Sequence, residues 1–505
     1  MDKTKDERIE EERFSPSVVQ KKPSLKINLF LNIIYEALTV IIPLFTAPYI
    51  SRVFGSDGIG VYSYTHSLVT YFILFSTLGV GLYGVKKIAS FRDNRQEYSK
   101  CFWEIEIVVA FSTTICFLLW MVLSICYVQY RVYLLIFSFL VINCMLDIGW
   151  FYKGLERFQY TVIINIIIKI TVLVLIFVLI KSKGDLWLYI LISSLSIFLG
   201  SLSMWLFLPK FLVKTRINSR DVLKHFKETI IYFAPSIAAT VYTVLDKTLI
   251  GLITHDESQN GYYEQATKII TICKSLCFVA INGVMTSRMS YYYSVGNAEQ
   301  IKSGVDKTMH VTMFLSIGAC FGLIGVSAIF VPLFFGDEFY YTIKLLYILA
   351  PIIPIICLSG VLGSLVYTPS GNIKKATLFM IIGSLVNLLL NIPLILFYNY
   401  IGAAIASVCA EAIISFLFFV FAKATYSLKD LVNSIWKKLI SGSLMLALIL
   451  VLNWLLAAYL KPIFLTLLDV AAGFIFYLFV LVILKDESVS IVVNSLIKKN
   501  TRRRS

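Results

Sequence analysis

Long apolar runs, each close to the length of a membrane span, alternate along this chain with short polar or basic segments. A helix needs about 20 mainly apolar residues to cross a bilayer, and it satisfies its own backbone hydrogen bonds in lipid. The runs are continuous rather than alternating with a period of two, so they indicate helices and not a barrel. We predict about fourteen spans, near 27–50, 61–84, 104–127, 132–151, 160–180, 186–208, 229–253, 262–285, 309–335, 343–367, 376–398, 401–422, 436–460 and 463–484.

The spans fall into two sets of six, followed by a final pair. A polar, basic stretch separates the two sets and is the clearest internal boundary in the chain. The predicted parts are a tail at 1–26, an N-terminal lobe at 27–208, a linker at 209–228, a C-terminal lobe at 229–422, two further spans within 436–484 and a basic tail at 485–505.

A short motif recurs after the first span of each lobe. Gly60-Val61-Tyr62 follows a polar turn expected at 51–60, and Gly261-Tyr262-Tyr263 follows the polar turn after the seventh span. The repeat suggests two lobes of parallel topology with a pseudo-twofold relation. Transporters commonly bind their substrates between such repeated bundles.

Composition and charge support a multi-pass membrane protein. The 505 residues are 58% hydrophobic, with a mean hydropathy of +0.81. Thirty-five of the 45 Lys and Arg residues fall in loops or tails on one predicted side, and five fall in the opposite loops. Because positively charged loops stay in the cytoplasm, we predict that both termini are cytoplasmic. The net charge of +15 then reflects topology and contact with anionic lipid, not a nucleic-acid partner.

Several chemistries lack a sequence signal. The nine cysteines are scattered singly and the four histidines are isolated, so we expect no metal site and no disulfide framework. The chain has no phosphate-binding GxxxxGK[ST] loop, and we expect no cofactor. The N-terminal tail lacks the basic region, apolar core and cleavage site of a signal peptide.

Charges inside the seventh and eighth spans are the main candidates for function. Asp246 and Lys247 interrupt the first of these spans, and Lys268 and Lys274 interrupt the second. A charge at the bilayer centre costs roughly 2.5–3.5 kcal/mol on insertion scales, so such residues face a bundle interior or a wet cavity. We expect the three lysines to line a cationic cavity and Asp246 to act in coupling or in the cavity wall. The alternative is that these charges form ion pairs within the bundle and have no role in transport, for example Asp246 with Lys268.

Three further ionisable residues lie inside other predicted spans. Glu36, Lys169 and Glu411 occur in the first, fifth and twelfth spans. Each could take part in coupling or line the cavity, and each could instead pair within the bundle. We favour pairing for these three.

Several segments together carry a family resemblance. They are APYISRVFGSDGIGVYSY, WFYKGLERF, YTVLDKTLIGL, GYYEQATKI and the region from Gly360–Gly363 to Pro369-Ser370-Gly371. The chain resembles bacterial oligosaccharide flippases of the polysaccharide transporter family, which share a superfamily with multidrug (MATE-type) exporters and the lipid II flippase. The resemblance covers essentially the whole chain.

The resemblance implies a fold, a substrate and partners. It implies a two-lobed bundle that moves undecaprenyl-diphosphate-linked oligosaccharides from the inner to the outer leaflet by alternating access. The repeat units would enter capsule or O-antigen synthesis, with a polysaccharide polymerase and glycosyltransferases as further partners. Of the basic residues that contact the diphosphate in the lipid II flippase, only Lys268 has a counterpart here, since Thr46 and Leu74 stand at two others.

Two other functions are alternatives to flipping. A cation-coupled multidrug antiporter of the same superfamily would favour acidic residues in its cavity, whereas lysines are at least as prominent here. A membrane-embedded polysaccharide polymerase or glycosyltransferase would need catalytic groups clustered on a sizeable loop, and the outer loops are about ten residues or shorter. The sequence therefore favours a transporter and not an enzyme.

Overall fold

The computed structural model describes residues 25–278 and 284–491. Within these ranges the chain forms helices and no strands, as predicted. The helices are α2 (Leu25–Thr77), α3 (Val80–Ser90), α4 (Arg95–Cys126), α5 (Arg131–Leu146), α6 (Gly149–Gly154), α7 (Phe158–Leu179), α8 (Leu186–Trp205), α9 (Ser219–Thr254), α10 (Glu257–Phe278), α11 (Val284–Ser294), α12 (Ala298–Phe335), α13 (Thr342–Leu349), α14 (Ile352–Leu362), α15 (Ile373–Tyr398), α16 (Tyr400–Phe421), α17 (Leu428–Leu456) and α18 (Pro462–Ile483).

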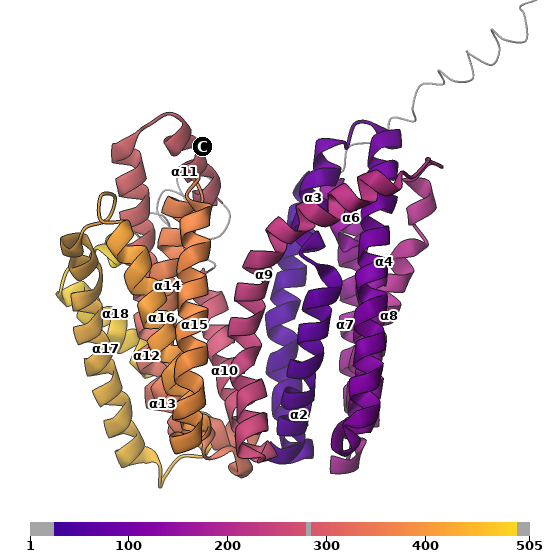
Figure 1. Cartoon of the computed structure of the whole chain (residues 1–505). Helices are drawn as coiled ribbons and strands as arrows, with labels where there is room; N and C mark the ends of the chain where they lie inside the picture. Colours follow the sequence, from indigo (N-terminus) through magenta and orange to yellow (C-terminus); the bar gives the residue numbers. More distant parts are fainter. Residues whose placement is uncertain (1–24, 279–283, 492–505) are drawn as a thin grey trace, which may run out of the picture.

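The helices form two groups that converge at one end of the molecule and diverge at the other (Figure 1). The N-terminal group consists of α2 to α8, and the C-terminal group consists of α10 to α16. The helix α9 runs obliquely from the N-terminal group at the divergent end to the C-terminal group at the convergent end (Figure 1). We call the two ends the open end and the contact end.

The prediction of a turn at 51–60 is wrong, because α2 continues through these residues. The helix is interrupted at Gly55, which has a φ of 69° and a ψ of −174°. A residue with a Cβ rarely adopts this conformation, so glycine permits the kink without a loop. The first predicted span and most of the second are therefore the two halves of one kinked helix.

Eleven segments among the described residues are long and apolar enough to span a membrane. One of them, Ile41–Ser90, has 50 residues and is long enough for two passes at 1.5 Å per residue. The helices α9 and α10, which carry the charges of the predicted cavity, are not among the eleven. The count of fourteen stays a prediction.

The polar stretch expected at 209–228 is helical in its second half, where α9 begins. Asn218 caps this helix by accepting a hydrogen bond from the backbone N–H of Arg220. Lys100 Nζ lies 2.7 Å from Asp221 Oδ2 and holds the pKa of that carboxyl below its usual range through a hydrogen bond. On the next turn, His225 Nε2 lies 3.2 Å from Glu104 Oε2. These contacts attach the start of α9 to α4 of the N-terminal group.

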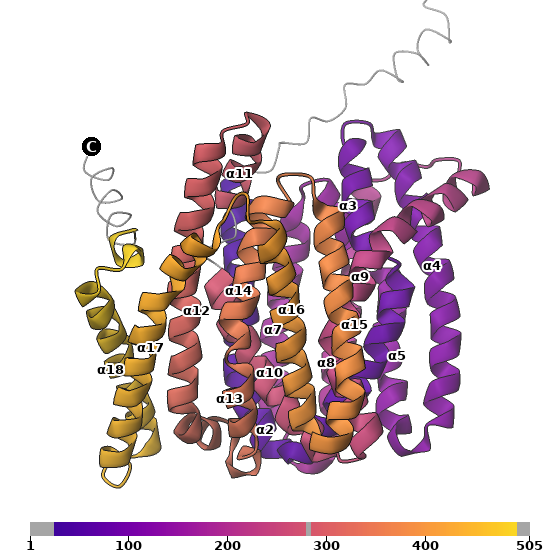
Figure 2. The same cartoon turned by 60° about the vertical axis from the view of Figure 1, so that its left-hand side comes forward.

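The last two helices stand outside the two groups. Both α17 and α18 pack against α12 and against each other, at the edge of the molecule (Figure 2). A buried cluster that includes Phe314, Met445 and Tyr477 forms this contact.

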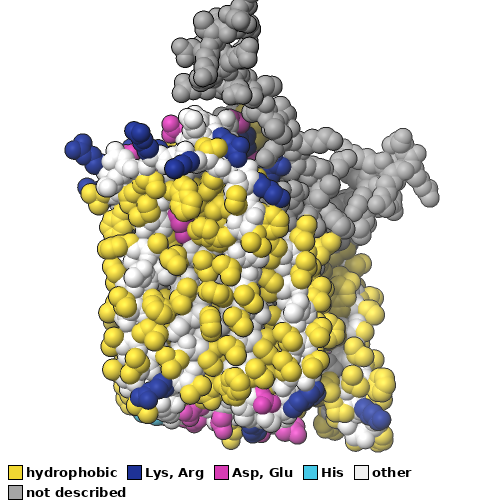
Figure 3. Space-filling view, turned by 90° about the vertical axis from the view of Figure 1, so that its right-hand side faces the viewer, with side chains coloured by type: hydrophobic (Ala, Val, Ile, Leu, Met, Phe, Trp, Pro, Cys, Tyr) yellow, Lys and Arg dark blue, Asp and Glu magenta, His cyan; other side chains and the backbone are white. Residues whose placement is uncertain are grey.

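An apolar belt surrounds the helices on the face shown in Figure 3, with charged side chains gathered at its two edges. Phe111 and Leu118 of α4 are 64% and 60% exposed. Exposing such side chains to water costs about 25 cal/mol per Å² of apolar surface. The belt is therefore a surface for lipid, as in a multi-pass membrane protein.

Candidate functional site

At the contact end, the two glycines of the repeated motif bring α2 and α10 into close backbone approach. A Cβ on Gly60 would lie 1.7 Å from the carbonyl oxygen of Glu257, and a Cβ on Gly261 would lie 2.0 Å from the carbonyl oxygen of Ser56. Real Cβ atoms do not come this close to backbone atoms, so only glycine fits at either position. The two copies of the motif thus close one end of the interface against each other.

Polar contacts surround this glycine crossing. Tyr130 donates a hydrogen bond of 2.8 Å to Glu257 Oε1, and Ser258 donates one to Asp57. Glu338 accepts a hydrogen bond of 3.2 Å from the backbone N–H of Ser56. Its other carboxylate oxygen lies 3.3 Å from Lys183 Nζ. Asp57, Lys183 and Glu338 are exposed, so their contacts supplement the close backbone packing rather than replace it.

Deeper between the two groups of helices, a carboxylate lies between two lysines. Lys247 Nζ lies 2.6 Å from Glu264 Oε2, and Lys268 Nζ lies 3.3 Å from Glu264 Oε1. Ser63 of α2 donates a hydrogen bond of 2.8 Å to the same Oε2. The Glu264 cluster therefore joins α2, α9 and α10.

The charge of this cluster is unbalanced. Glu264 is buried, whereas the side chains of Lys247 and Lys268 are 21% and 29% exposed. Two ammonium groups and one carboxylate leave one excess positive charge in a low-dielectric region, where electrostatic interactions are stronger than in water. An anion that reached the exposed parts of the lysines would be attracted.

Local helix geometry explains half of this cluster. Glu264 and Lys268 are four residues apart on α10, a spacing that places side chains on one face of a helix. Lys247 comes from α9, which packs against α10 across the tight turn between them. The tertiary contact, not the sequence spacing, supplies the second lysine.

Asp246, the neighbour of Lys247 in sequence, belongs to a different cluster inside the C-terminal group. Tyr263 and Ser407 donate hydrogen bonds to its Oδ2, and Asn391 Nδ2 donates one of 2.8 Å to its Oδ1. The side-chain carbonyl oxygens of Asn387 and Asn391 are buried and have no hydrogen-bond partner. We call this the Asp246 cluster.

The Asp246 cluster is chemically suited to a proton or a hard cation. It combines a buried carboxylate, two unpaired amide oxygens and two hydroxyls, all of which are oxygen ligands. Its residues lie on α9, α10, α15 and α16, so the whole cluster lies outside the N-terminal group. It is therefore separate from the Glu264 cluster in both position and charge.

The expected site residues therefore do not form one site. Lys247 and Lys268 come together on Glu264, so both are paired within the bundle, as the alternative predicted, and their role in a cavity stays a prediction. Pairing of Asp246 with Lys268, the alternative considered from the sequence, is wrong, because Glu264 is the partner of Lys268 and neutral donors surround Asp246. Lys274 lies farther along α10, within electrostatic range of Glu411 on α16.

The last two expected residues are Lys169 and Glu36. Lys169 is half-buried on α7 of the N-terminal group. The side chain of Glu36 falls outside the described residues.

Sequence reasoning missed the carboxylate at the centre of the site. Glu264 lies in the segment GYYEQATKI, four residues before Lys268, and this spacing was an available signal. Ser63, Asn391 and Ser407 are uncharged residues on other helices, and no sequence spacing connects them to the charges that they contact.

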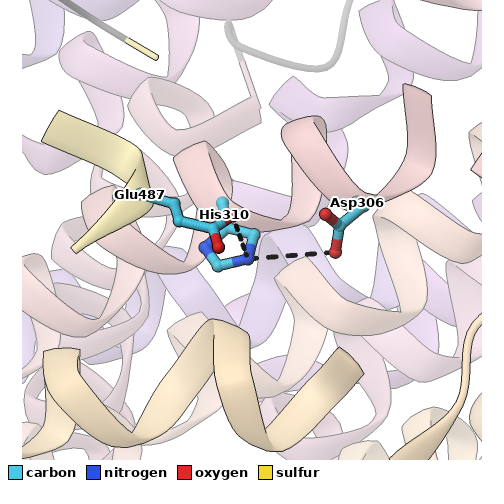
Figure 4. Close-up of side chains that lie close together, drawn as sticks. All are labelled: Asp306, His310 and Glu487. Carbon is cyan, nitrogen blue, oxygen red and sulfur yellow. Dashed lines mark ion pairs between the residues drawn. The ribbon is translucent and has the colours of Figure 1, made fainter. Parts of the chain in front are cut away.

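A third cluster lies near the open end of α12. His310 Nε2 is 3.8 Å from Asp306 Oδ1 and 3.6 Å from Glu487 Oε2 (Figure 4). On the other side of the ring, Nδ1 faces the fully buried Lys438 Nζ at 3.4 Å. A lysine donor at Nδ1 favours the tautomer with hydrogen on Nε2, which then points toward the two carboxylates. This geometry fits an ion-pair network better than a metal site.

Comparison with known proteins gives a consistent result. A family model described as polysaccharide biosynthesis protein matches residues 25–293, more than half of the chain. A putative O-antigen transporter from Escherichia coli (strain K12) is 24% identical over 412 residues, covering 79% of this chain and 97% of that protein. A probable low-salt glycan biosynthesis flippase, Agl15, from Haloferax volcanii is 27% identical over 198 residues, covering 39% of this chain and 40% of that protein.

Solved structures of the same fold include two kinds of transporter. The lipid II flippase MurJ in an inward closed conformation superposes with a TM-score of 0.66 at 19% identity, covering 93% of this chain and 99% of MurJ. An inward-facing multidrug resistance MATE family transporter superposes with a TM-score of 0.57 at 14% identity, covering 77% and 94%. The resemblance and the fold class inferred from the sequence are confirmed.

Proposed function

Because the chain belongs to the polysaccharide biosynthesis protein family, we propose that it flips undecaprenyl-diphosphate-linked oligosaccharides across the bacterial inner membrane. The repeat units would serve capsule or O-antigen synthesis. Named relatives are a putative O-antigen transporter and a probable glycan flippase, which agrees with a transporter rather than an enzyme. A polysaccharide polymerase and glycosyltransferases would act after and before this step.

The observation that carries the proposal is the excess positive charge of the Glu264 cluster between the two groups of helices. A diphosphate is a compact polyanion, and lysine ammonium groups bind phosphate as point charges. Lys247 and Lys268 would attract the diphosphate, and Lys274 would contribute from six residues, about 1.7 turns, farther along α10. The prenyl chain would stay in lipid.

Alternating access provides the route across the membrane. Closure at the contact end and divergence at the open end support an arrangement in which the cavity opens to one side at a time. We assign the open end to the cytoplasm, because the Lys- and Arg-rich loops lie there. Closing the open end and separating the glycine crossing would release the oligosaccharide outside.

We assign the Asp246 cluster to coupling. A buried carboxylate with unpaired amide oxygens nearby could gain or lose a proton or a cation as the C-terminal group changes its packing. Glu36, Lys169 and Glu411 are the other ionisable candidates for coupling or for the cavity.

The test is complementation in a strain that lacks its own repeat-unit flippase. Lys247→Ala, Lys268→Ala and Lys274→Ala would be compared at matched protein levels with Lys344→Ala, an exposed lysine on α13. We expect lost surface polymer and accumulated lipid-linked repeat units for the cavity variants, and normal polymer for the control.

Normal polymer from all three cavity variants would overturn the cationic site. The same unmutated chain would be tested for ion-driven efflux of cationic drugs. Efflux without rescue would favour the antiporter, the second candidate, which the oxygen-rich Asp246 cluster makes chemically reasonable.

A further inference from the structure

The segment between α8 and the first turns of α9 carries an excess of positive charge at the open end. We call residues 206–231 the strap. Two of them are acidic and six are basic. All six basic residues are exposed, and none forms an ion pair with a described residue; they are Lys210, Lys214, Arg216, Arg220, Lys224 and Lys227.

The two acidic residues of the strap pair with the N-terminal group. Asp221 Oδ2 lies 2.7 Å from Lys100 Nζ of α4, and Glu228 Oε2 lies 3.2 Å from Lys87 Nζ of α3. Neither carboxylate forms an ion pair with a basic residue of the strap. The exposed cations of the strap are therefore left unbalanced.

Hydrogen bonds to the start of α4 fix the backbone of the strap before α9 begins. Arg95 Nε and the hydroxyl of Tyr98 donate hydrogen bonds of 2.8 and 2.9 Å to the carbonyl oxygen of Phe211. Ser99 Oγ accepts one of 3.1 Å from the backbone N–H of Val213. A surface held in this way is preorganised, so binding a ligand requires little further ordering of the chain.

Exposed apolar side chains place the strap at the edge of the apolar belt. Leu199 and Leu202 of α8 are exposed, and Leu206, where the strap begins, is 77% exposed. Ile217 and Leu223 are also exposed and lie among the cations. Lys and Arg side chains border the belt along its upper edge in Figure 3. Segments that mix basic and apolar side chains lie in the headgroup region, where the apolar groups reach the acyl chains and the cations reach phosphate.

From this arrangement we propose that the strap binds anionic phospholipid headgroups of the leaflet at the open end. The six unpaired cations supply the attraction to anionic lipid, and the exposed apolar side chains hold the strap at headgroup depth. The strap continues into α9, which carries Lys247 near its other end, so bound headgroups hold the start of that helix at the membrane surface. This surface does not depend on which substrate is transported.

The test measures lipid selectivity at the strap in the full chain. A bimane label would be attached to Ser219→Cys, an exposed position within the strap, after Cys126, Cys273 and Cys409 are replaced by serine. The chain would be placed in phosphatidylcholine nanodiscs and quenched with nitroxide-labelled phosphatidylglycerol or phosphatidylcholine. Because each basic residue near an anionic surface contributes about fivefold to binding, we expect half-maximal quenching at an at least tenfold lower fraction of phosphatidylglycerol. The same label on Tyr340→Cys, at the contact end, should show a much smaller preference.

Variants test whether the strap cations cause the preference. Arg216→Gln combined with Arg220→Gln should lower it about fivefold or more, and high salt should weaken it in the parent. Quenching by phosphatidylcholine should remain, which would show that the strap of the variant stays at headgroup depth. Lys374→Gln combined with Lys375→Gln is the matched control, because these exposed lysines of α15 form no ion pair with a described residue and their loss changes the net charge equally.

Several results would overturn the proposal. Equal quenching by the two lipids, or an equal preference at Tyr340→Cys, would show that the strap has no anionic selectivity of its own. A preference that survives the Arg216 and Arg220 substitutions, or that the Lys374 and Lys375 control lowers as much, would exclude the strap cations as its cause. Displacement of phosphatidylglycerol by equimolar farnesyl diphosphate would assign the strap to the diphosphate substrate instead. Flipping enters none of these readouts, so the proposed function can fail while this surface stands.

Discussion

The two ends of the interface between the helix groups are held in different ways. At the contact end, backbone lies against backbone at the Gly60–Gly261 crossing, and polar contacts that include the exposed Lys183–Glu338 pair surround it. At the open end the groups diverge, and α9 is fastened to the N-terminal group by Lys100–Asp221 and by His225–Glu104 (Figure 1). The contact end thus depends on shape, and the attachment of α9 at the open end depends on charge.

This difference indicates how the protein can change state. Surface ion pairs contribute about 0–1 kcal/mol each and do not lock an interface. Close backbone packing, rather than any surface ion pair, is the main contact that holds this end closed. One added methyl group there should therefore have a larger effect than the loss of any surrounding ion pair.

One distance reports the state of the contact end. Spin labels on Arg131→Cys and Tyr340→Cys, two exposed positions in different groups, would be measured by double electron–electron resonance. The exposed Cys126 and the half-buried Cys273 and Cys409 would first be replaced by serine.

The largest expected effect is that of Gly60→Ala. A Cβ 1.7 Å from the carbonyl oxygen of Glu257 cannot be accommodated, so the contact end should stay separated and transport should be essentially lost. Gly322→Ala is the control, because a Cβ there meets only Met445 at an ordinary 3.7 Å. An unchanged spin-label distance with normal transport would contradict the steric account.

The second effect is that of Glu264→Gln. The variant leaves two lysines without their carboxylate and weakens the contact with Ser63 of α2, so the closed contact end should lose about 1.5–3 kcal/mol, the strength of hydrogen bonds to charged groups. The spin-label distribution should shift toward longer distances. If the second substitution Lys247→Met does not partly restore it, charge imbalance is not the cause.

The third effect is that of Asp246→Asn, which tests whether the two clusters are separate. The hydrogen-bond donors to Asp246 lie on α10, α15 and α16, outside the N-terminal group, so we expect the free energy of unfolding to fall by about 1–3 kcal/mol through mismatched donors. The spin-label distances should stay as in the parent. A shift as large as that of Glu264→Gln would show that the Asp246 cluster also holds the contact end.

The smallest effect is that of Lys183→Gln. The side chains of Lys183 and Glu338 are 65% and 56% exposed, and pairs of this kind contribute about 0.2–1 kcal/mol. We expect a small shift of the spin-label populations that disappears at high salt. A shift that persists at high salt would mean that Lys183 acts through packing.

The sequence predicted the fold class well, because the bilayer requires apolar helices of a fixed minimum length and keeps basic residues in the loops. It also identified Lys247 and Lys268, since lysines inside apolar spans are costly and therefore conspicuous. It did not identify Glu264 as their common partner. Uncharged members such as Ser63 and Asn391 carried no signal, because polar residues of this kind are frequent and their partners lie far away in sequence.

By itself, the sequence determined that this protein is a helical membrane transporter with buried charges and a repeated glycine motif. Only the tertiary structure showed which residues the buried charges and the motif glycines contact. Adjacent side chains on a helix point about 100° apart, so Asp246 and Lys247 enter different clusters, and only the packing of α9 shows which. The two motif glycines are about 200 residues apart in sequence, and the structure shows that they permit the close crossing of α2 and α10.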